Sequence, residues 1–569
     1  MRTEIGLVAP SELPERLLVS QVDVLPGEFH VVHAETLRQS KEMTEFWERR
    51  THRLLREARE RSSPGAYHAL VRHYLRSQQA EQARVMLEEA TSRGLSSPAL
   101  KAAHVQILCR VEPLRVESYL KELTASYNLN PDDPEFIVDV SRALLLSGDK
   151  RNARNFLERL NAVPEDDASA LAAASELWWI IRDEGSAWRL AERSTLIDAN
   201  QVRAWNVMAS VSVHQAEYSR ALDYFSRALS VDPLFRPALI NIIVLKMNYL
   251  GEVADFNRAR DYVQAYGTDV QFAYRIAVLA WKSGEQALVK WIWDSLREHS
   301  ACEDGTLRIG LMITSAGALG GERESAISFE SLVMRLDSRT PNAAVDAAVW
   351  ISKESRFHKL LPLIVSLRDK CNSIQWLSEA LSGLLAYAAR GAHAALPSME
   401  RAFRSNAASD MLTRLLANLY LDSGSHYREA AELAGKTLDS DMSGLGEWNN
   451  AIYADLMNNN VARARDRWDR VSRRPAWSIV VQNNHYVRAT YGLLLMRSGL
   501  CDEGLVEYVE AEKIAKSDSE KARVIQKGKL EMGREMKRVG RVAFARPYLE
   551  AAAVGPDSLF ATEARELMK

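Results

Sequence analysis

Residues whose types and spacing suggest chemistry are rare in this chain. The nearest match to a phosphate-binding loop is Gly435-Lys436-Thr437. Such a loop needs another glycine five residues earlier, so that backbone amides can wrap the phosphates. That position is Ala430, which lies inside a segment with the pattern of a helix. We therefore expect no nucleotide to bind there.

A metal site is equally unsupported. His30 and His33 lie three residues apart, but their surroundings have the pattern of a strand, in which such positions face opposite sides. The four cysteines lie far apart, with no CxxC pair: Cys109, Cys302, Cys371 and Cys501. We interpret them as buried free thiols in a reducing compartment.

Motifs of catalysis and cofactor binding are also missing. The chain has no G-x-S-x-G, H-E-x-x-H or G-x-G-x-x-G pattern and no EF-hand loop. These patterns position nucleophiles, zinc, dinucleotides and calcium in the enzymes and binding proteins that use them. We therefore predict that the protein is not an enzyme and carries no cofactor.

Composition places the chain among ordinary soluble proteins. Its 569 residues have a formal net charge of -2, with 26% charged and 47% hydrophobic residues, so no global charge attracts nucleic acid or anionic membranes. The first residues lack a basic region followed by an apolar one, so we expect no secretory signal. The longest uncharged stretches, such as 309–321 and 475–487, are shorter than the roughly 18 apolar residues of a membrane helix. We expect a cytoplasmic protein that does not span a membrane.

Basic residues are nevertheless concentrated in the C-terminal third. Residues 521–546 hold nine basic residues against Glu531 and Glu535, and 461–474 hold six arginines against two aspartates. Such a patch attracts an acidic protein, nucleic acid or anionic lipid, and the alternative is a solvated face that keeps the protein soluble. The candidate residues of this basic patch are Arg463, Arg467, Arg470, Lys527, Lys529, Arg534, Lys537, Arg538 and Arg541.

The elements that must position these residues form a repeat. The clearest unit runs from Trp205 to Pro233 and reads as two amphipathic helices around a turn at Gln215-Ala216-Glu217. Its aromatic, small and proline landmarks resemble those of the tetratricopeptide repeat family, and they are Trp205, Ala221, Phe225, Ala228 and Pro233. The first helix departs from the family pattern, so the resemblance depends mainly on the second helix.

The spacing of small residues gives the register of the repeat. Ala153, Ala187 and Ala221 are spaced 34 residues apart, and Ala83 lies 70 residues before Ala153. Corresponding positions beyond Pro233 are Ala259, Ala287, Ala326, Leu360, Ala395, Ala430, Ala464, Gly504 and Ala545. The last two steps are 40 and 41 residues long, so these units need longer helices or turns.

The resemblance implies an all-α fold. We expect a right-handed superhelical solenoid of about fourteen stacked helical hairpins over residues 64–569. Residues 1–63 do not fit the repeat and are expected to form a separate segment. Within it, 17–34 have the pattern of a β-hairpin around Pro26-Gly27, and about 35–61 have the pattern of a polar helix that caps the solenoid.

In the resembled family the first helix of each hairpin lines the concave face. Transferring that position by position gives candidate groove residues: His68, Arg72, Arg76, Arg142, Asn206, His214, Asn449, Asn450 and Tyr453. Asparagine can bind an extended peptide backbone through both its donor and its acceptor, whereas the alternative is that these are merely solvated polar positions. The Lys and Asn set with which some members hold a C-terminal carboxylate is not reproduced in adjacent units, so we do not expect that ligand.

Three functions are compatible with this sequence. The leading one is a non-enzymatic scaffold or adaptor that presents a concave helical groove to another protein or peptide segment within a larger assembly. A nucleic-acid-binding repeat protein that uses the basic C-terminal third is the second. The third is a regulatory subunit or region of an associated enzyme. The repeat sets the manner of binding, while scattered surface residues set the partner.

Replacing Ala221 tests the register. An Ala221→Leu substitution should overpack the contact between the two helices of the hairpin and lower the free energy of unfolding by about 1 to 3 kcal/mol. Thermal or denaturant melting would measure the loss, and an unchanged melting curve would mean that the register is wrong.

Overall fold

A computed structural model describes most of the chain. The described residues are 40–76, 80–97, 134–146, 149–161, 168–265, 269–297, 302–407, 409–424, 426–438, 445–515 and 517–569, together with 100, 101, 103, 104 and 107. Every regular element within these ranges is helical, which confirms the predicted all-α fold. The predicted β-hairpin over 17–34 lies outside the described residues.

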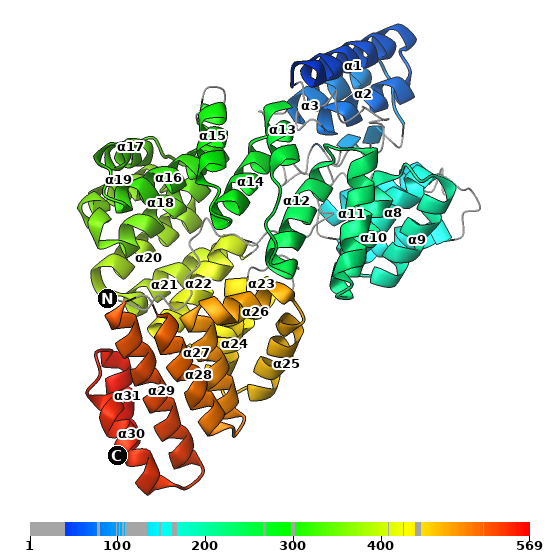
Figure 1. Ribbon diagram of the computed structural model, residues 1–569. Helices are drawn as coiled ribbons and strands as arrows, with labels where there is room; N and C mark the ends of the chain where they lie inside the picture. The colour runs from blue at the N-terminus through cyan, green and yellow to red at the C-terminus, as the bar shows by residue number, and fades with distance from the viewer. Residues whose placement is uncertain are drawn as a thin grey trace. The chain divides into compact units, whose positions relative to one another are not determined.

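Contacts divide the chain into two compact units, which we describe separately (Figure 1). The N-terminal unit comprises Leu17–Leu245 and Ala254–Ile276. Its described elements are α1 (Ser40–Arg61), α2 (Pro64–Arg76), α3 (Ala80–Ser92), α6 (Pro134–Leu146), α7 (Lys150–Glu158), a 3-10 turn (Arg159–Asn161), α8 (Ala168–Ile181), α9 (Glu184–Ile197), α10 (Val202–His214), α11 (Tyr218–Val231), α12 (Arg236–Val244), α13 (Asn257–Ala265) and the beginning of α14 (Val270–Lys282).

The C-terminal unit includes Lys246–Val253 and Ala277–Lys569. It contains most of a π-helical turn (Leu245–Leu250) and a 3-10 turn (Ser355–Leu360). After the end of α14, its α-helices are α15 (Gln286–Arg297), α16 (Asp304–Leu319), α17 (Arg323–Met334), α18 (Pro341–Lys353), α19 (Leu361–Lys370), α20 (Gln375–Arg390), α21 (Ala392–Ser405), α22 (Asp410–Ser423), α23 (Tyr427–Leu438), α24 (Leu445–Met457), α25 (Val461–Ser472), α26 (Pro475–Asn483), α27 (His485–Arg497), α28 (Cys501–Ile514), α29 (Asp518–Arg538), α30 (Val542–Ala553) and α31 (Ser558–Met568).

Successive helices pack as hairpins, as the repeat predicts. In the clearest unit, α10 and α11 meet at a turn in which Ala216 has a φ of 59°. The small landmarks Ala221 and Ala228, together with Phe225, are completely buried on α11. A single hairpin cannot bury both of its apolar faces, so each one packs on its neighbours. The structure thus confirms the resemblance to tetratricopeptide repeats at the level of the hairpin.

One position of the predicted register is wrong. Ala287 is exposed, whereas Val289 is completely buried. The amide of Val289 donates to the carbonyl of Glu285 across the start of α15, as the amide of Ala221 donates to that of Glu217 at the start of α11. The packing position is therefore Val289, two residues later. Local shortening of the repeat had displaced the assignment.

The two long steps of the repeat have different structural causes. The step from Ala464 to Gly504 contains an additional helix, α26, between the hairpin of α24 and α25 and the hairpin of α27 and α28. The step from Gly504 to Ala545 contains α29, which is 21 residues long. The expectation of longer helices or turns in these units is therefore confirmed.

Helix α1 confirms the described part of the predicted N-terminal helix. Its Leu54 and Ala58 are buried and belong to the same apolar cluster as Tyr67 and Leu70 of α2. The remaining face carries most of the charged residues of the helix. An apolar stripe on one side and charges on the other are what an end helix of a repeat array requires.

The additional helix α26 also receives a segment from much earlier in the chain. The Arg474 guanidinium, just before α26, lies 4.2 Å from the ring centre of Tyr249 and 4.9 Å from that of Trp448. Gly251 has a φ of +71°, and a Cβ there would lie 2.5 Å from Cδ1 of Ile479. Glycine is required at this turn, because it permits both the φ value and the close approach.

Helices α27 and α28 approach each other through two glycines. A Cβ on Gly492 would lie 2.7 Å from the carbonyl oxygen of Gly504, and a Cβ on Gly504 would lie 2.6 Å from that of Gly492. Backbone therefore contacts backbone at this crossing. Figure 1 shows α27, α28 and α29 side by side in the C-terminal unit.

A methyl group at this crossing should separate the helices. We expect Gly492→Ala to lower the free energy of unfolding by about 1 to 3 kcal/mol, because the backbone must move to accept the new atom. Chemical denaturation would measure the change. Gly65→Ala is the matched control, since a Cβ at Gly65 meets no atom within 4 Å. Equal effects of the two substitutions would contradict the close approach.

Candidate functional site

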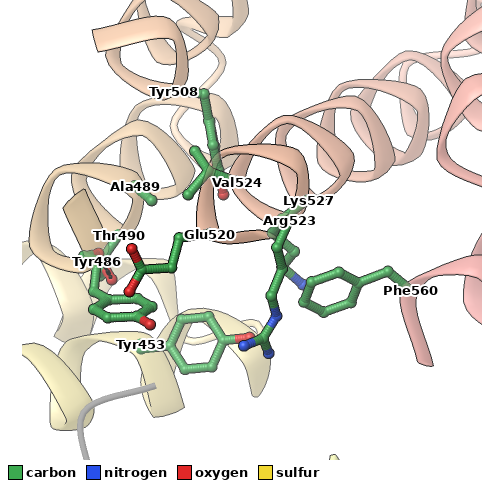
Figure 2. Close-up of a pocket in the computed structure, with 10 residues that line it drawn as sticks. All are labelled: Tyr453, Tyr486, Ala489, Thr490, Tyr508, Glu520, Arg523, Val524, Lys527 and Phe560. Atoms are coloured by element: carbon green, nitrogen blue, oxygen red, sulfur yellow. Dashed lines mark hydrogen bonds between the residues drawn. The ribbon is translucent and has the colours of Figure 1, made fainter. Parts of the chain in front are cut away.

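The inner positions of consecutive hairpins enclose a pocket in the C-terminal unit (Figure 2). Helices α24, α27, α29 and α31 provide its walls, and α28 contributes one tyrosine. The pocket has a volume of about 530 Å³, part of it open to solvent. Its lining residues are Tyr453, Tyr486, Ala489, Thr490, Tyr508, Glu520, Arg523, Val524, Lys527 and Phe560.

Helical spacing explains why these side chains converge. On α27, Tyr486, Ala489 and Thr490 are separated by three and four residues and therefore share one face. On α29, the positions from Glu520 to Lys527 recur at the same intervals. The walls are mainly aromatic and apolar. A regular arrangement of first helices thus produces a concave apolar surface.

Lys527 is fixed at one side of the pocket. Its Nζ lies 4.7 Å from the ring centre of Phe560 and 5.9 Å from that of Tyr453. The same Nζ lies 2.8 Å from Oε1 of Glu531. An ammonium between a carboxylate and an aromatic face is held by both Coulomb and cation–π attraction. Lys527 therefore belongs to the pocket wall.

Arg523 and Glu520 are fixed one helical turn apart on α29. Nε of Arg523 lies 2.9 Å from Oδ2 of Asp557, while its Nη2 is buried with no hydrogen-bond acceptor among the described residues. Oε2 of Glu520 accepts from the amide of Ser517 at 2.9 Å, and the Glu520 amide donates to Oγ of Ser517 at 3.2 Å. This capping box holds the first turn of α29 in place.

Beneath the pocket, the completely buried carboxylate of Glu531 organises three cations. Lys527, Arg534 and Arg497 approach its oxygens at 2.8, 2.7 and 2.8 Å. Burial raises the pKa of Glu531, but the three cations outweigh burial and lower the pKa to about 2. A second buried carboxylate, that of Glu535, lies 3.3 Å from Arg497. The network connects α27 to α29.

The tyrosines of the pocket stay neutral. Burial raises the pKa of the hydroxyl groups of Tyr453 and Tyr508, and the nearby charge of Glu531 raises the pKa of both further. They provide apolar rings with a polar tip at neutral pH. No ionised nucleophile or base comes from them.

The structure does not gather the basic patch into one exposed surface. Lys527 and Arg534 face Glu531, Arg463 and Arg467 pair with the buried Asp455, Arg538 pairs with Glu535, and Nζ of Lys537 donates to the carbonyl of Leu567. Lys529 is half-buried, whereas Arg470 and Arg541 are exposed. Most of the basic patch therefore neutralises buried carboxylates. Binding of a partner by its remaining cations stays a prediction.

Most candidate groove residues are buried. Tyr453 lines the pocket, whereas Asn449, His68 and Arg142 are at most 8% exposed. Two asparagine pairs join neighbouring first helices, since Asn241 donates to Asn206 at 3.1 Å and Asn450 donates to Asn418 at 3.2 Å. These amides are occupied in packing and do not face solvent.

The remaining candidate groove residues lie at different kinds of position. Nδ1 of His214 lies 2.6 Å from Oε1 of Glu184, and its ring meets that of Trp179 edge-on at 4.8 Å. The side chains of Arg72 and Arg76 lie outside the described structure. Ligand binding by the groove residues other than Tyr453 stays a prediction without support from exposure.

The sequence analysis missed most of the pocket. Phe560, Arg523 and Tyr486 were not singled out, although Tyr486, Ala489 and Thr490 follow the spacing of a helix face. The decisive signal would have been the alignment of α27, α29 and α31 as first helices. The unequal lengths of their units concealed that alignment.

The expectations about other chemistry have mixed outcomes. Gly435, Lys436 and Thr437 lie within α23, and Ala430 is buried there, so no phosphate-binding loop is formed. Among the described residues, no cluster of three potential metal ligands occurs, and no helix is both long and apolar enough to cross a bilayer. Of the thiols, Cys371 is buried, but Cys302 is exposed, contrary to expectation. His30, His33 and Cys109 lie outside the described residues.

Comparisons with known proteins leave the function open. No protein-family model matches the chain, and no curated protein matches it. Among solved structures, the chain is similar to the crystal structure of the APC/C hetero-tetramer Cut9–Hcn1, with 10% identity, coverage of 82% of this chain and 89% of that chain, and a TM-score of 0.35. It is also similar to yeast Tom70, with 10% identity, coverage of 76% and 94%, and a TM-score of 0.27. Superpositions this loose carry no argument about function, which must come from the pocket.

Removing the buried carboxylate should destabilise the pocket. Glu531→Gln leaves Lys527, Arg534 and Arg497 without their shared anion, and we expect a loss of about 3 to 5 kcal/mol at pH 7. Because the pKa of Glu531 is lower in the folded state, its stabilisation is complete above its ordinary pKa of 4.5 and is lost as the pH falls toward 2. Denaturant melting at pH 7 and at pH 3 should therefore show a smaller difference between variant and wild type at pH 3. Glu510→Gln, at the partly exposed pair with Lys513, is the control and should change little. A pH-independent effect of Glu531→Gln would contradict the assigned role.

Proposed function

We propose that the protein is a non-enzymatic scaffold that holds an extended segment of another protein in the pocket of the C-terminal unit. The observation that carries this proposal is the position of the pocket, which is built from the first helices of consecutive hairpins. Consecutive first helices form a continuous concave surface, and an extended peptide can follow it while inserting a side chain. The described site has no catalytic constellation.

The character of the lining supports a protein partner over nucleic acid. Nucleic-acid binding requires cations that are free to meet phosphates. Here Lys527 pairs with Glu531 and Arg523 pairs with Asp557. The walls are instead aromatic and apolar, as in pockets that anchor a side chain of a protein partner.

A random peptide library displayed on phage would test the proposal with the full chain as bait. We expect a family of related peptides to be enriched. An Ala489→Phe variant, which fills the pocket from α27, should weaken their affinity by at least about tenfold, or ~1.4 kcal/mol. Titration calorimetry would measure the affinities. Ala462→Phe makes the same change at an exposed position of α25 and should leave them unchanged.

Two outcomes would contradict the proposal. The first is that no peptide is enriched, or that enriched peptides bind the Ala489→Phe variant as tightly as the wild type. The second is tight binding of single-stranded RNA whose affinity falls steeply with salt, since that would favour the nucleic-acid alternative.

A further inference from the structure

The pocket contains information about the side chain that it accepts. Three of its aromatic residues, Tyr453, Tyr508 and Phe560, are at most 7% exposed, so their positions are determined by packing. With Val524 and Ala489 they leave a space bounded mainly by carbon atoms. Aromatic rings attract another ring through edge-to-face or offset contacts. An aromatic side chain therefore suits these walls.

A cationic side chain is disfavoured by Lys527. A ring of aromatic residues ordinarily attracts ammonium groups. In this pocket the Nζ of Lys527 already occupies that position, 4.7 Å from the centre of Phe560 and 5.9 Å from that of Tyr453. It is held there by Glu531 at 2.8 Å. A second cation would meet the charge of Lys527 at close range in a poorly solvated site.

Two side chains on α29 suit the backbone of a bound peptide. Glu520 presents a carboxylate, which has more acceptor sites than the one bond from Ser517 uses. Arg523 presents donors, and its Nη2 has no acceptor among the described residues, which is costly for a buried donor. Both residues line the pocket from neighbouring turns of one helix. Together they offer an acceptor for a peptide N–H group and a donor for a peptide carbonyl.

We propose that the pocket recognises an aromatic residue within an extended peptide, with its ring between Tyr453, Tyr508 and Phe560 and its backbone between Glu520 and Arg523. In this arrangement Lys527 is the specificity-determining residue that rejects lysine and arginine at the same position. The inference rests on the proposed function, because it names the segment that the scaffold holds.

Capped amino acids would test the recognition directly. The probes are N-acetyl-L-phenylalaninamide, N-acetyl-L-lysinamide and N-acetyl-L-serinamide, and saturation-transfer NMR with the full chain would detect their binding. We expect saturation of the phenylalanine probe alone, lost in Ala489→Phe and retained in Ala462→Phe. N-methylation of the acetylated nitrogen removes the N–H donor and should weaken binding about threefold to tenfold, the range expected for one hydrogen bond.

A charge-removing variant tests the role of Lys527. Lys527→Met keeps the length of the side chain and leaves Glu531 with Arg534 and Arg497. We expect this variant to bind the lysine probe, because Phe560 and Tyr453 become available to a cation, while it still binds the phenylalanine probe. Circular dichroism would verify that it folds. If it does not fold, discrimination between the phenylalanine and lysine probes by the wild type, with its loss in Ala489→Phe, decides the question.

The outcomes separate this inference from the proposed function. If library peptides bind but the phenylalanine probe neither binds nor competes with them, the aromatic specificity is wrong and the scaffold proposal stands. If the phenylalanine probe binds in the pocket but no peptide does, the scaffold proposal is wrong. Equal binding of the lysine and phenylalanine probes by the wild type would overturn the role of Lys527.

Discussion

The C-terminal unit depends on one buried charge. The carboxylate of Glu531 is completely enclosed, yet it stays ionised because Lys527, Arg534 and Arg497 surround it. An enclosed anion demands cations at fixed positions, since leaving any charge unpaired there is costly. This demand determines the direction of Lys527 and hence one wall of the pocket. It also ties α27 to α29, so the shape of the pocket and the packing of the hairpins have a common cause.

The backbone contacts of the same region complete that constraint. Gly492 and Gly504 let α27 and α28 approach until backbone meets backbone, which brings Tyr508 of α28 to the pocket. Ser517 and Glu520 fix the beginning of α29, from which the polar side chains of the pocket emerge. A binding site on rigid helices, supported from behind by ion pairs, loses little conformational entropy when a ligand arrives.

The sequence predicts the local features of this fold well and the charge arrangement poorly. Ala221 and Phe225 follow from the spacing within one hairpin, because packing of two adjacent helices repeats the same geometry each time. Ala287 was misplaced by two residues, because a shortened unit shifts the register without leaving a local mark. The basic patch was misjudged for a different reason. Counting charges along the chain treats Glu531 as one anion among many, whereas burial allows it to bind three cations at once. Asn206 and Asn449 were expected to face a ligand, but polar side chains on first helices can equally pair with the next hairpin.

The contact between Tyr249 and Arg474 has a mechanical consequence. A repeat array in which each hairpin touches only its neighbours stretches like a spring and loses its hairpins one at a time. Tyr249 and Arg474 are 225 residues apart in the chain, and their contact closes a loop around the hairpins between them. Tension applied across that loop must first break the stacking on Arg474 before any enclosed hairpin carries the load. The enclosed hairpins should therefore give way together, as a brittle element within an otherwise elastic chain.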